Sequence, residues 1–127
     1  MAWENLPSTN TPLNATNLNQ FERHSTSEIV IGKWIDNKPI YRKVITINSL
    51  PVNSLGRYPH NILNVNSVIK CYGECFKESG EIGRESFSLP ISNIYLWGDL
   101  TNIDIATTSD RSSFKANIVI EYTKTTD

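Results

Sequence analysis

Residues 25–47 constrain the fold of this chain more than any other segment, because they read as a β-hairpin. Two runs rich in β-branched and aromatic residues, 28–35 and 39–47, flank the sequence Asp-Asn-Lys at 36–38. Val, Ile, Trp and Tyr suit a half-buried strand, while Asp and Asn tolerate the left-handed backbone that a tight turn requires. The segment predicts two antiparallel strands, with Trp34 in the core.

The chain after residue 47 shows shorter strand patterns separated by turn-forming residues. Residues 114–122 give the clearest one, because every second residue from Phe114 to Tyr122 is apolar and those between are mostly polar. Further strands are predicted at 67–76, 84–89, 91–97 and 102–106, with a turn at 77–81 and a long connection at 48–65. About seven or eight strands in all indicate an all-β fold, an antiparallel β-sandwich with one solvated outer face.

The first 24 residues are predicted to be a leader that precedes a head domain at 25–127. Thr11 and Pro12 suit the start of a helix, since Thr is an N-cap residue and Pro is preferred at the first helical position. This short helix, or an extended leader in its place, has too few large apolar residues to be stable alone. We expect it to dock on the head, on sister chains or on a larger assembly through Trp3, Leu13, Leu18 and Phe21.

Length and charge exclude several classes of function. A chain of 127 residues suits one domain with its own core. The net charge is -1, from 12 basic and 13 acidic residues, which argues against binding to nucleic acid or anionic lipid. No apolar run approaches the roughly 20 residues that span a bilayer, and the N-terminus lacks the pattern of a secretory signal. We expect a soluble protein made in a cytoplasm, without membrane insertion.

Cys71 and Cys75 lie four residues apart in a predicted strand. Four residues of straight strand span about 13 Å, whereas the Cα atoms of a disulfide lie about 5.5 Å apart, so we expect two reduced thiols. A bulge at Gly73 would shorten that distance. A zinc site needs about four ligands, and the two histidines, His24 and His60, show no matching spacing. We expect no metal and no cofactor.

Catalytic motifs do not stand out in the sequence. Neither histidine neighbours a nucleophile signature such as G-x-S-x-G, and there is no P-loop or dinucleotide-binding glycine pattern. Glu74, Glu78, Glu81 and Glu85 cluster around one turn, and a solvated turn gives this pattern far more often than the paired carboxylates of a glycosidase do. We therefore predict a non-enzymatic protein.

Four separated segments agree in order with one known type of domain. The hairpin carries S-T-x-E-x-x-x-G-x-W-I-D-x-K-P-I-Y-x-K, and the leader carries W-E-N-L-P-S-T-N-T-P-L-N-A-T-N-L-N. Leu50-Pro51 leads to P-H-N-I at 59–62, and the chain closes with F-K-A-N-I-V-I-E-Y-T-K-T-T. These segments resemble small β-structured domains of tailed-bacteriophage fibre, baseplate and related virion proteins. The family usually has Gly where this chain has Asn37, and Asn also reaches positive φ.

The resemblance implies a homotrimeric β-sandwich head on an elongated viral fibre, acting in attachment to the host surface. It implies a virion protein, made in the host cytoplasm and exposed on the particle. The implied partners are sister chains, other virion proteins through the leader, and host cell-surface polysaccharide. The family supplies no motif for a ligand pocket, so no binding residue follows from the resemblance.

Candidate ligand-binding residues are therefore argued from chemistry. Sugars bind through aromatic faces and rigid polar groups, and a shallow patch suffices when three copies act together. The first candidate cluster is Tyr95, Trp97 and Asp99, joined by Asp110 and Arg111 from a later loop, and the second is Asn53, Arg57 and Tyr58. Strand aromatics also fit core or subunit packing, which remains the alternative.

A second class of function stays open beside glycan attachment. The chain also fits a purely structural virion component, such as a head fibre, a capsid decoration or a baseplate adaptor without its own ligand. The short leader of about 24 residues favours this alternative, because receptor-binding fibres usually carry a long shaft.

Overall fold

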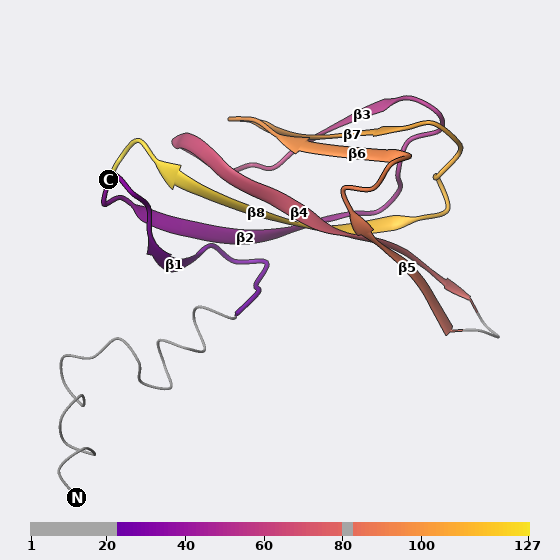
Figure 1. Ribbon diagram of the computed structural model, residues 1–127, viewed down its shortest axis with the longest axis horizontal. Coiled ribbons are helices and arrows are strands. Elements are labelled where there is room, and N and C mark those ends of the chain that lie inside the picture. Colours follow the sequence, from indigo (N-terminus) through magenta and orange to yellow (C-terminus); the bar gives the residue numbers. More distant parts are fainter. Residues whose placement is uncertain (1–22, 80–82) are drawn as a thin grey trace, which may run out of the picture.

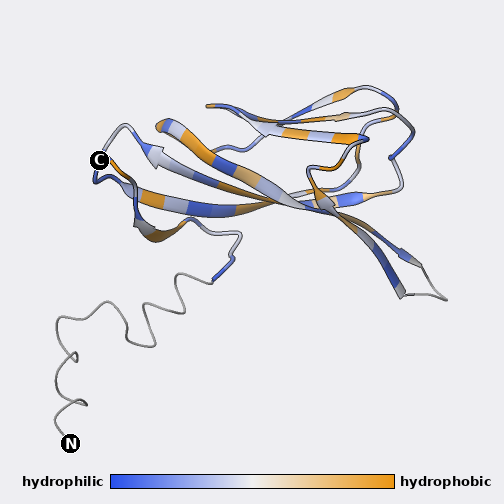
Figure 2. Cartoon of the chain, in the orientation of Figure 1, coloured by the Kyte–Doolittle hydropathy of each residue, from blue (hydrophilic) through white to orange (hydrophobic). Residues whose placement is uncertain are grey.

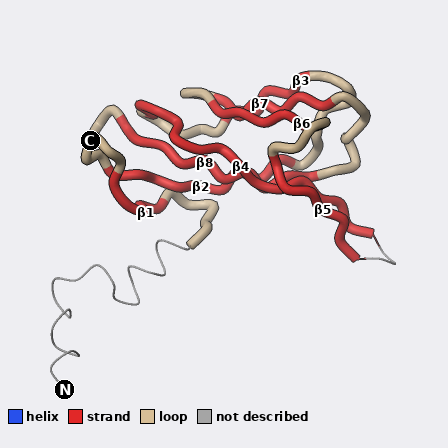
Figure 3. The backbone as a smooth tube through the Cα atoms, viewed as in Figure 1, coloured by secondary structure: helices blue, strands red, loops and turns tan. Residues whose placement is uncertain are grey.

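The computed structural model describes residues 23–79 and 83–127, which form strands, turns and loops without a helix (Figure 3). The all-β prediction is confirmed. The predicted leader helix and its docking residues, Trp3, Leu13, Leu18 and Phe21, lie outside the described residues. The described strands are β1 (Ile29–Lys33), β2 (Pro39–Ile47), β3 (Leu55–Pro59), β4 (Val65–Ser79), β5 (Gly83–Leu89), β6 (Ile94–Gly98), β7 (Asn102–Thr107) and β8 (Lys115–Lys124).

The strands form two antiparallel sheets that lie one above the other (Figure 1). The larger sheet has the order β1-β2-β8-β4-β5, and the smaller has the order β3-β7-β6. The last strand in the sequence, β8, lies in the middle of the larger sheet and pairs with β2 and β4. The β4–β5 hairpin extends beyond the smaller sheet (Figure 1). The two layers therefore overlap over only part of the larger sheet.

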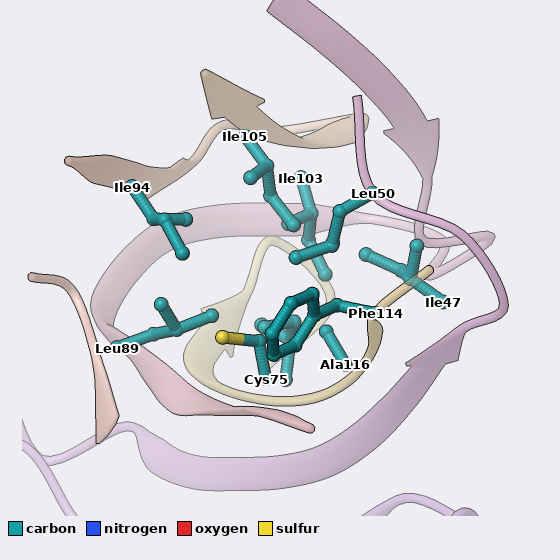
Figure 4. Close-up of a cluster of buried hydrophobic side chains, with 10 residues drawn as sticks. Ile47, Leu50, Cys75, Leu89, Ile94, Ile103, Ile105, Phe114 and Ala116 are labelled. Carbon is teal, nitrogen blue, oxygen red and sulfur yellow. The ribbon is translucent and has the colours of Figure 1, made fainter. Parts of the chain in front are cut away.

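The core lies between the two layers. Ile103 and Ile105 of β7 face Ala116 and Ile118 of β8, and all four side chains are fully buried. Figure 4 shows this cluster, with Phe114 and Cys75 among the aliphatic side chains. Hydrophobic and hydrophilic stretches alternate along the strands (Figure 2). This alternation directs apolar side chains inward, and their removal from water is the main force that holds the sheets together.

The inward face of β8 follows the sequence prediction, but its outward face is less open to solvent than expected. Val119 and Glu121, on the outward face, are buried as well. Glu121 forms an ion pair with Arg42 of β2 at 2.9 Å, and Arg42 donates a further hydrogen bond to the carbonyl of Arg23. The segment that enters the fold at Arg23 thus covers part of the larger sheet. The prediction of a solvated outer face is wrong at Val119 and Glu121 of β8.

The predicted hairpin forms, and its turn uses the expected residue. Asn37 has a φ of 68°, the left-handed conformation expected at this position. The loop begins two residues earlier than the sequence suggested, because β1 ends at Lys33, Trp34 N donates to Lys38 O and Asn37 N donates to Trp34 O. Trp34 therefore lies in the loop beyond the last strand pair and is 39% exposed. The expectation that Trp34 belongs to the core is wrong for the described residues.

Strand β3 lies within the segment predicted to be a connection. It contains Gly56 and ends at Pro59, residues that are rare in strand interiors but tolerated at a sheet edge. β3 is an edge strand of the smaller sheet. The ring of Tyr58 and the side chain of Pro51 occupy the space next to Gly56, so a Cβ atom there would require them to shift. The strand was missed because its composition is that of a loop.

Cys71 and Cys75 are free cysteines on the inward face of β4. Burial raises the pKa of the Cys71 thiol to about 11. A buried thiol that stays protonated near neutral pH is a poor nucleophile. Both side chains serve as small apolar groups in or beside the core.

The close pairing of β4 with β8 at Gly73 gives a first prediction. A Cβ atom at Gly73 would overlap the backbone oxygen of Asn117, and backbone cannot move aside cheaply. We expect Gly73→Ala to lower the free energy of unfolding by about 1–3 kcal/mol, the usual cost of overpacking. Urea unfolding followed by tryptophan fluorescence measures this change.

Gly32→Ala is the matched control, because nothing lies within 4 Å of a Cβ atom there. We expect this variant to unfold within about 1 kcal/mol of the parent protein. Equal effects of the two substitutions would contradict the close approach of β4 and β8.

Candidate functional site

Strand alternation gathers polar and aromatic side chains on the outer face of the smaller sheet. Ile103 and Ile105 point into the core, so Asp104 between them points outward. In the strand register, Arg57 of β3 and Trp97 of β6 lie directly opposite Asp104 on its two sides. Leu55 and Tyr95 form the neighbouring row, on either side of Ala106. We call Leu55, Arg57, Tyr95, Trp97 and Asp104 the outer-face patch.

Arg57 and Asp104 form a bidentate ion pair across two strands. Arg57 Nε donates to Asp104 Oδ1 at 3.0 Å, and Nη2 donates to Oδ2 at 3.2 Å. The Asp104 side chain is only 3% exposed, whereas that of Arg57 is 60% exposed. The hydrogen bonds to Asp104, and then its charge, raise the pKa of Arg57. The pair therefore holds a planar cation in a fixed position on the surface.

Two aromatic side chains stand beside this pair. Tyr95 is 50% exposed and Trp97 is 44% exposed, and both belong to β6, the edge strand of the smaller sheet. Leu55, across the sheet from Tyr95, is also exposed. Half-exposed aromatic rings next to oriented polar groups can bind the apolar face of a sugar ring or the surface of another protein.

Asp99, a residue of the first candidate cluster, holds the turn between β6 and β7. Its Oδ1 accepts hydrogen bonds from Thr101 N at 2.8 Å and Asn102 N at 2.6 Å. These backbone donors, Thr101 first, lower the pKa of Asp99. His60 Nε2 contacts the Asp99 carbonyl at 3.0 Å. The carboxylate of Asp99 therefore stabilises the turn beside the patch.

Asp110 and Asn53 lie at the opposite end of the smaller sheet from Asp99. Asn53 N donates to Ser109 O, and Val52 forms a β-bridge with Asp110. The hydroxyl and the backbone N–H of Ser112 donate to Asp110 and lower its pKa. Both residues thus build the loop that closes this end, outside the patch.

Tyr58 and Arg111 point away from the outer face. Tyr58 packs against the core cluster, and its hydroxyl donates to Ser49 O at 3.1 Å. Arg111 lies with its guanidinium carbon 5.5 Å from the centre of the Phe114 ring. The structure therefore brings Tyr95 and Trp97 of the first candidate cluster together with Arg57 of the second. The other candidate residues lie outside the patch.

Asp104 and Leu55 are patch residues that the sequence interpretation missed. Asp104 had a detectable signal, because a carboxylate between two isoleucines in a predicted strand must emerge on the outer face. Leu55 had none, since its strand was taken for a loop.

A hollow of about 440 Å³ lies on the outer face of the larger sheet. His24, Ser25 and Thr26 form one wall, and the lining includes Val44, Thr46, Glu74 and Asn117. Glu74 is bound to Arg84 by two hydrogen bonds and accepts another from Asn117, and the bonds to Arg84 are the main cause of its lowered pKa. Its charge is thus already paired.

Residues 23–79 and 83–127 contain no group of three or more His, Cys, Asp or Glu side chains arranged to hold a metal ion. Among the same residues, no helix is long and apolar enough to cross a membrane. Comparison with protein-family models, with curated proteins and with solved structures finds no significant match to this chain.

The turn at Asp99 generates a pH prediction. Its pKa is lower in the folded chain than in the unfolded chain, so its contribution to stability is full above about pH 4 and is lost as the pH falls through the lowered value. We expect Asp99→Asn to be less stable than the parent protein at about pH 7, and the difference to shrink toward about pH 3. Urea unfolding at several pH values measures it, and a difference independent of pH would contradict the role of the charge.

Proposed function

We propose that this chain is the β-sandwich head of a fibre-type virion protein of a tailed bacteriophage, and that it attaches the particle to a glycan on the host surface. The sequence resemblance of the leader, the hairpin and the last strand supports the virion part of the proposal. The outer-face patch is the observation that carries the binding part. The proposed protein is non-enzymatic and works on the outside of the particle.

The chemistry of the patch suits a carbohydrate. The C–H faces of a sugar ring pack well on aromatic rings, and Tyr95 and Trp97 offer two of them on one face. Arg57 uses two of its five N–H donors on Asp104, which leaves the others to bind hydroxyl or carboxylate oxygens of a sugar. Because Asp104 holds the guanidinium in place, little conformational entropy is lost when a ligand binds.

A homotrimer would strengthen such a shallow site. Each head offers a patch of half-exposed side chains on a sheet surface, so the expected affinity of one head is weak. Three heads on one fibre would bind a repetitive polysaccharide with an avidity 10²–10⁴ times the single-site affinity. The proposed partners are thus two sister chains, other virion proteins held through the leader, and host polysaccharide.

Removal of the Trp97 ring tests the binding proposal. We expect fluorescently labelled Trp97→Ala protein to bind cells of a susceptible bacterial strain at least about tenfold more weakly than the parent protein, since tenfold corresponds to about 1.4 kcal/mol for one lost aromatic contact. Flow cytometry against a panel of strains measures the binding.

Leu63→Ala is the control, because Leu63 is an exposed apolar residue in the loop between β3 and β4, outside the patch. We expect it to bind like the parent protein. The proposed site would be wrong if the Trp97→Ala protein bound as strongly as the parent protein to every strain that the parent protein labels.

A structural role is the second candidate, and the tip of the β1–β2 hairpin favours it. Ile35 is 90% exposed, its neighbour Trp34 is exposed, and Val30 of β1 is exposed farther along the same hairpin. Apolar side chains grouped on a surface in this way often mark a contact with another chain. On this alternative the protein is a head fibre, a capsid decoration or a baseplate adaptor without its own ligand.

The hairpin tip gives a prediction about assembly. We expect the parent protein to show three times its chain mass of 14.4 kDa in light scattering, and Ile35→Ser to lower the measured mass at equal concentration. Trp97→Ala is the matched control and should leave the mass unchanged. A monomeric parent protein at micromolar concentration would contradict the trimer, and an unchanged mass for Ile35→Ser would contradict the role of the tip.

A further inference from the structure

A small cavity of about 140 Å³ lies where the chain enters β6. It is lined by Phe87, Ile91, Asn93, Ile94 and Arg111. Three of these side chains are apolar, one is an amide and one is a guanidinium. The cavity shares no residue with the outer-face patch.

The guanidinium of Arg111 is directed toward the protein interior. Arg111 Nε is buried and has no hydrogen-bond partner among residues 23–79 and 83–127. Its guanidinium carbon lies 5.5 Å from the centre of the buried Phe114 ring. Burial raises the pKa of the Cys75 thiol, and the charge of Arg111 acts in the opposite direction, so the cation lies close to the core.

No carboxylate within the described part of the chain neutralises Arg111. The ion pairs there are Arg42–Glu121, Arg57–Asp104, Lys77–Glu85, Arg84–Glu74 and Lys124–Glu28. Its sequence neighbour Asp110 accepts hydrogen bonds from Ser112 instead. Arg111 Nε is enclosed by protein atoms, so a ligand in the cavity would be bound by the Nη groups, and a partly buried cation without a counter-charge favours an anionic partner there.

Backbone hydrogen bonds hold the walls of this cavity in place. Arg111 N donates to Pro51 O at 3.1 Å, and its carbonyl accepts from Phe114 N at 2.9 Å. Ile91 and Ile94 exchange two backbone hydrogen bonds, each 3.1 Å long. The cavity is thus set in a fixed frame, which lowers the entropic cost of binding.

We propose that this cavity binds the carboxylate of a small ligand, with Arg111 as the anion-binding residue and the Asn93 side-chain amide as the second polar group. A planar guanidinium matches a carboxylate in geometry and charge. The apolar lining favours a carboxylate on a carbon body over a fully hydrated inorganic anion. This inference concerns a separate site and does not depend on glycan attachment through the patch.

The test is an NMR titration of the full-length ¹⁵N-labelled protein at constant ionic strength. Butyrate, glucuronate and the neutral analogue butyramide serve as probes. We expect butyrate or glucuronate to shift the signals of Asn93, Ile94 and Arg111 with saturation at a dissociation constant of about 1–10 mM, as one charge-assisted contact of this size supports. The acid with the lower dissociation constant tells whether the carboxylate that the cavity binds belongs to a free aliphatic acid or to an acidic sugar.

Three variants separate a built site from general anion binding. Arg111→Gln should abolish saturation, Arg111→Lys should weaken it because lysine lacks the planar fork, and Arg23→Gln should leave it unchanged while removing the same charge elsewhere. If Arg111→Gln fails to fold, the comparison of butyrate with butyramide on the parent protein shows whether binding requires the carboxylate. Equal shifts by butyramide, or no saturable shift with either acid, would overturn the proposal.

Discussion

The pairing of β8 between β2 and β4 is the constraint on which the rest of the structure depends. This strand joins the two hairpins of the larger sheet, and its residues Ala116, Ile118 and Ile120 are buried on the side of that sheet that faces the core. Because β8 is the last strand in the sequence, the larger sheet is complete only when β8 has paired with β2, near the start of the described chain. Most of the hydrophobic stabilisation therefore depends on contacts between residues far apart in sequence.

Polar interactions fasten the end of β8 to the start of the described chain. Glu28, just before β1, accepts hydrogen bonds from Tyr122 and Lys124. Tyr122 stacks on Tyr41 of β2 at 5.8 Å between ring centres, and Lys38 donates to the Lys124 carbonyl. Burial of Tyr122, followed by its hydrogen bond to Glu28, raises the pKa of its hydroxyl. The β1–β2 hairpin is thus locked onto β8 by side chains as well as by strand pairing.

The outer-face patch follows from the core by simple geometry. Ile103 and Ile105 are held inside, so the alternation of β7 turns Asp104 outward between β3 and β6. Asp104 then fixes Arg57, and the register of β6 sets Trp97 on its other side. The position of the proposed binding residues is therefore set by the same packing that stabilises the fold.

Sequence patterns predicted the strands well where alternation was strong and poorly where it was weak. Residues 114–122 showed a clear period of two, and the inward residues of β8 are those expected. β3 was missed because Gly56 and Pro59 resemble loop residues, although an edge strand tolerates them. The core prediction for Trp34 failed because composition does not show at which residue the pairing of β1 and β2 ends.

The candidate site was predictable only in part, since spatial proximity across strands depends on register. Tyr95 and Trp97 are candidates from the sequence, with core or subunit packing as the alternative, and Arg57 belongs to the other candidate cluster. Their meeting on one face required the order β3-β7-β6, which joins segments that are about 40 residues apart in the chain. No local pattern encodes that order. The buried partner Asp104 illustrates the same limit, because its role depends on Arg57 from another strand.

The most direct test of glycan attachment uses the indole N–H signals of the protein, which has three tryptophans. Surface polysaccharide purified from a bacterial strain that the protein labels would be added to ¹⁵N-labelled protein, and the indole signals followed by NMR. We expect the Trp97 signal to shift or broaden with saturation and the signal of Trp34, in the loop of the β1–β2 hairpin, to stay in place. An unchanged Trp97 signal at saturating polysaccharide would contradict the outer-face patch as the attachment site.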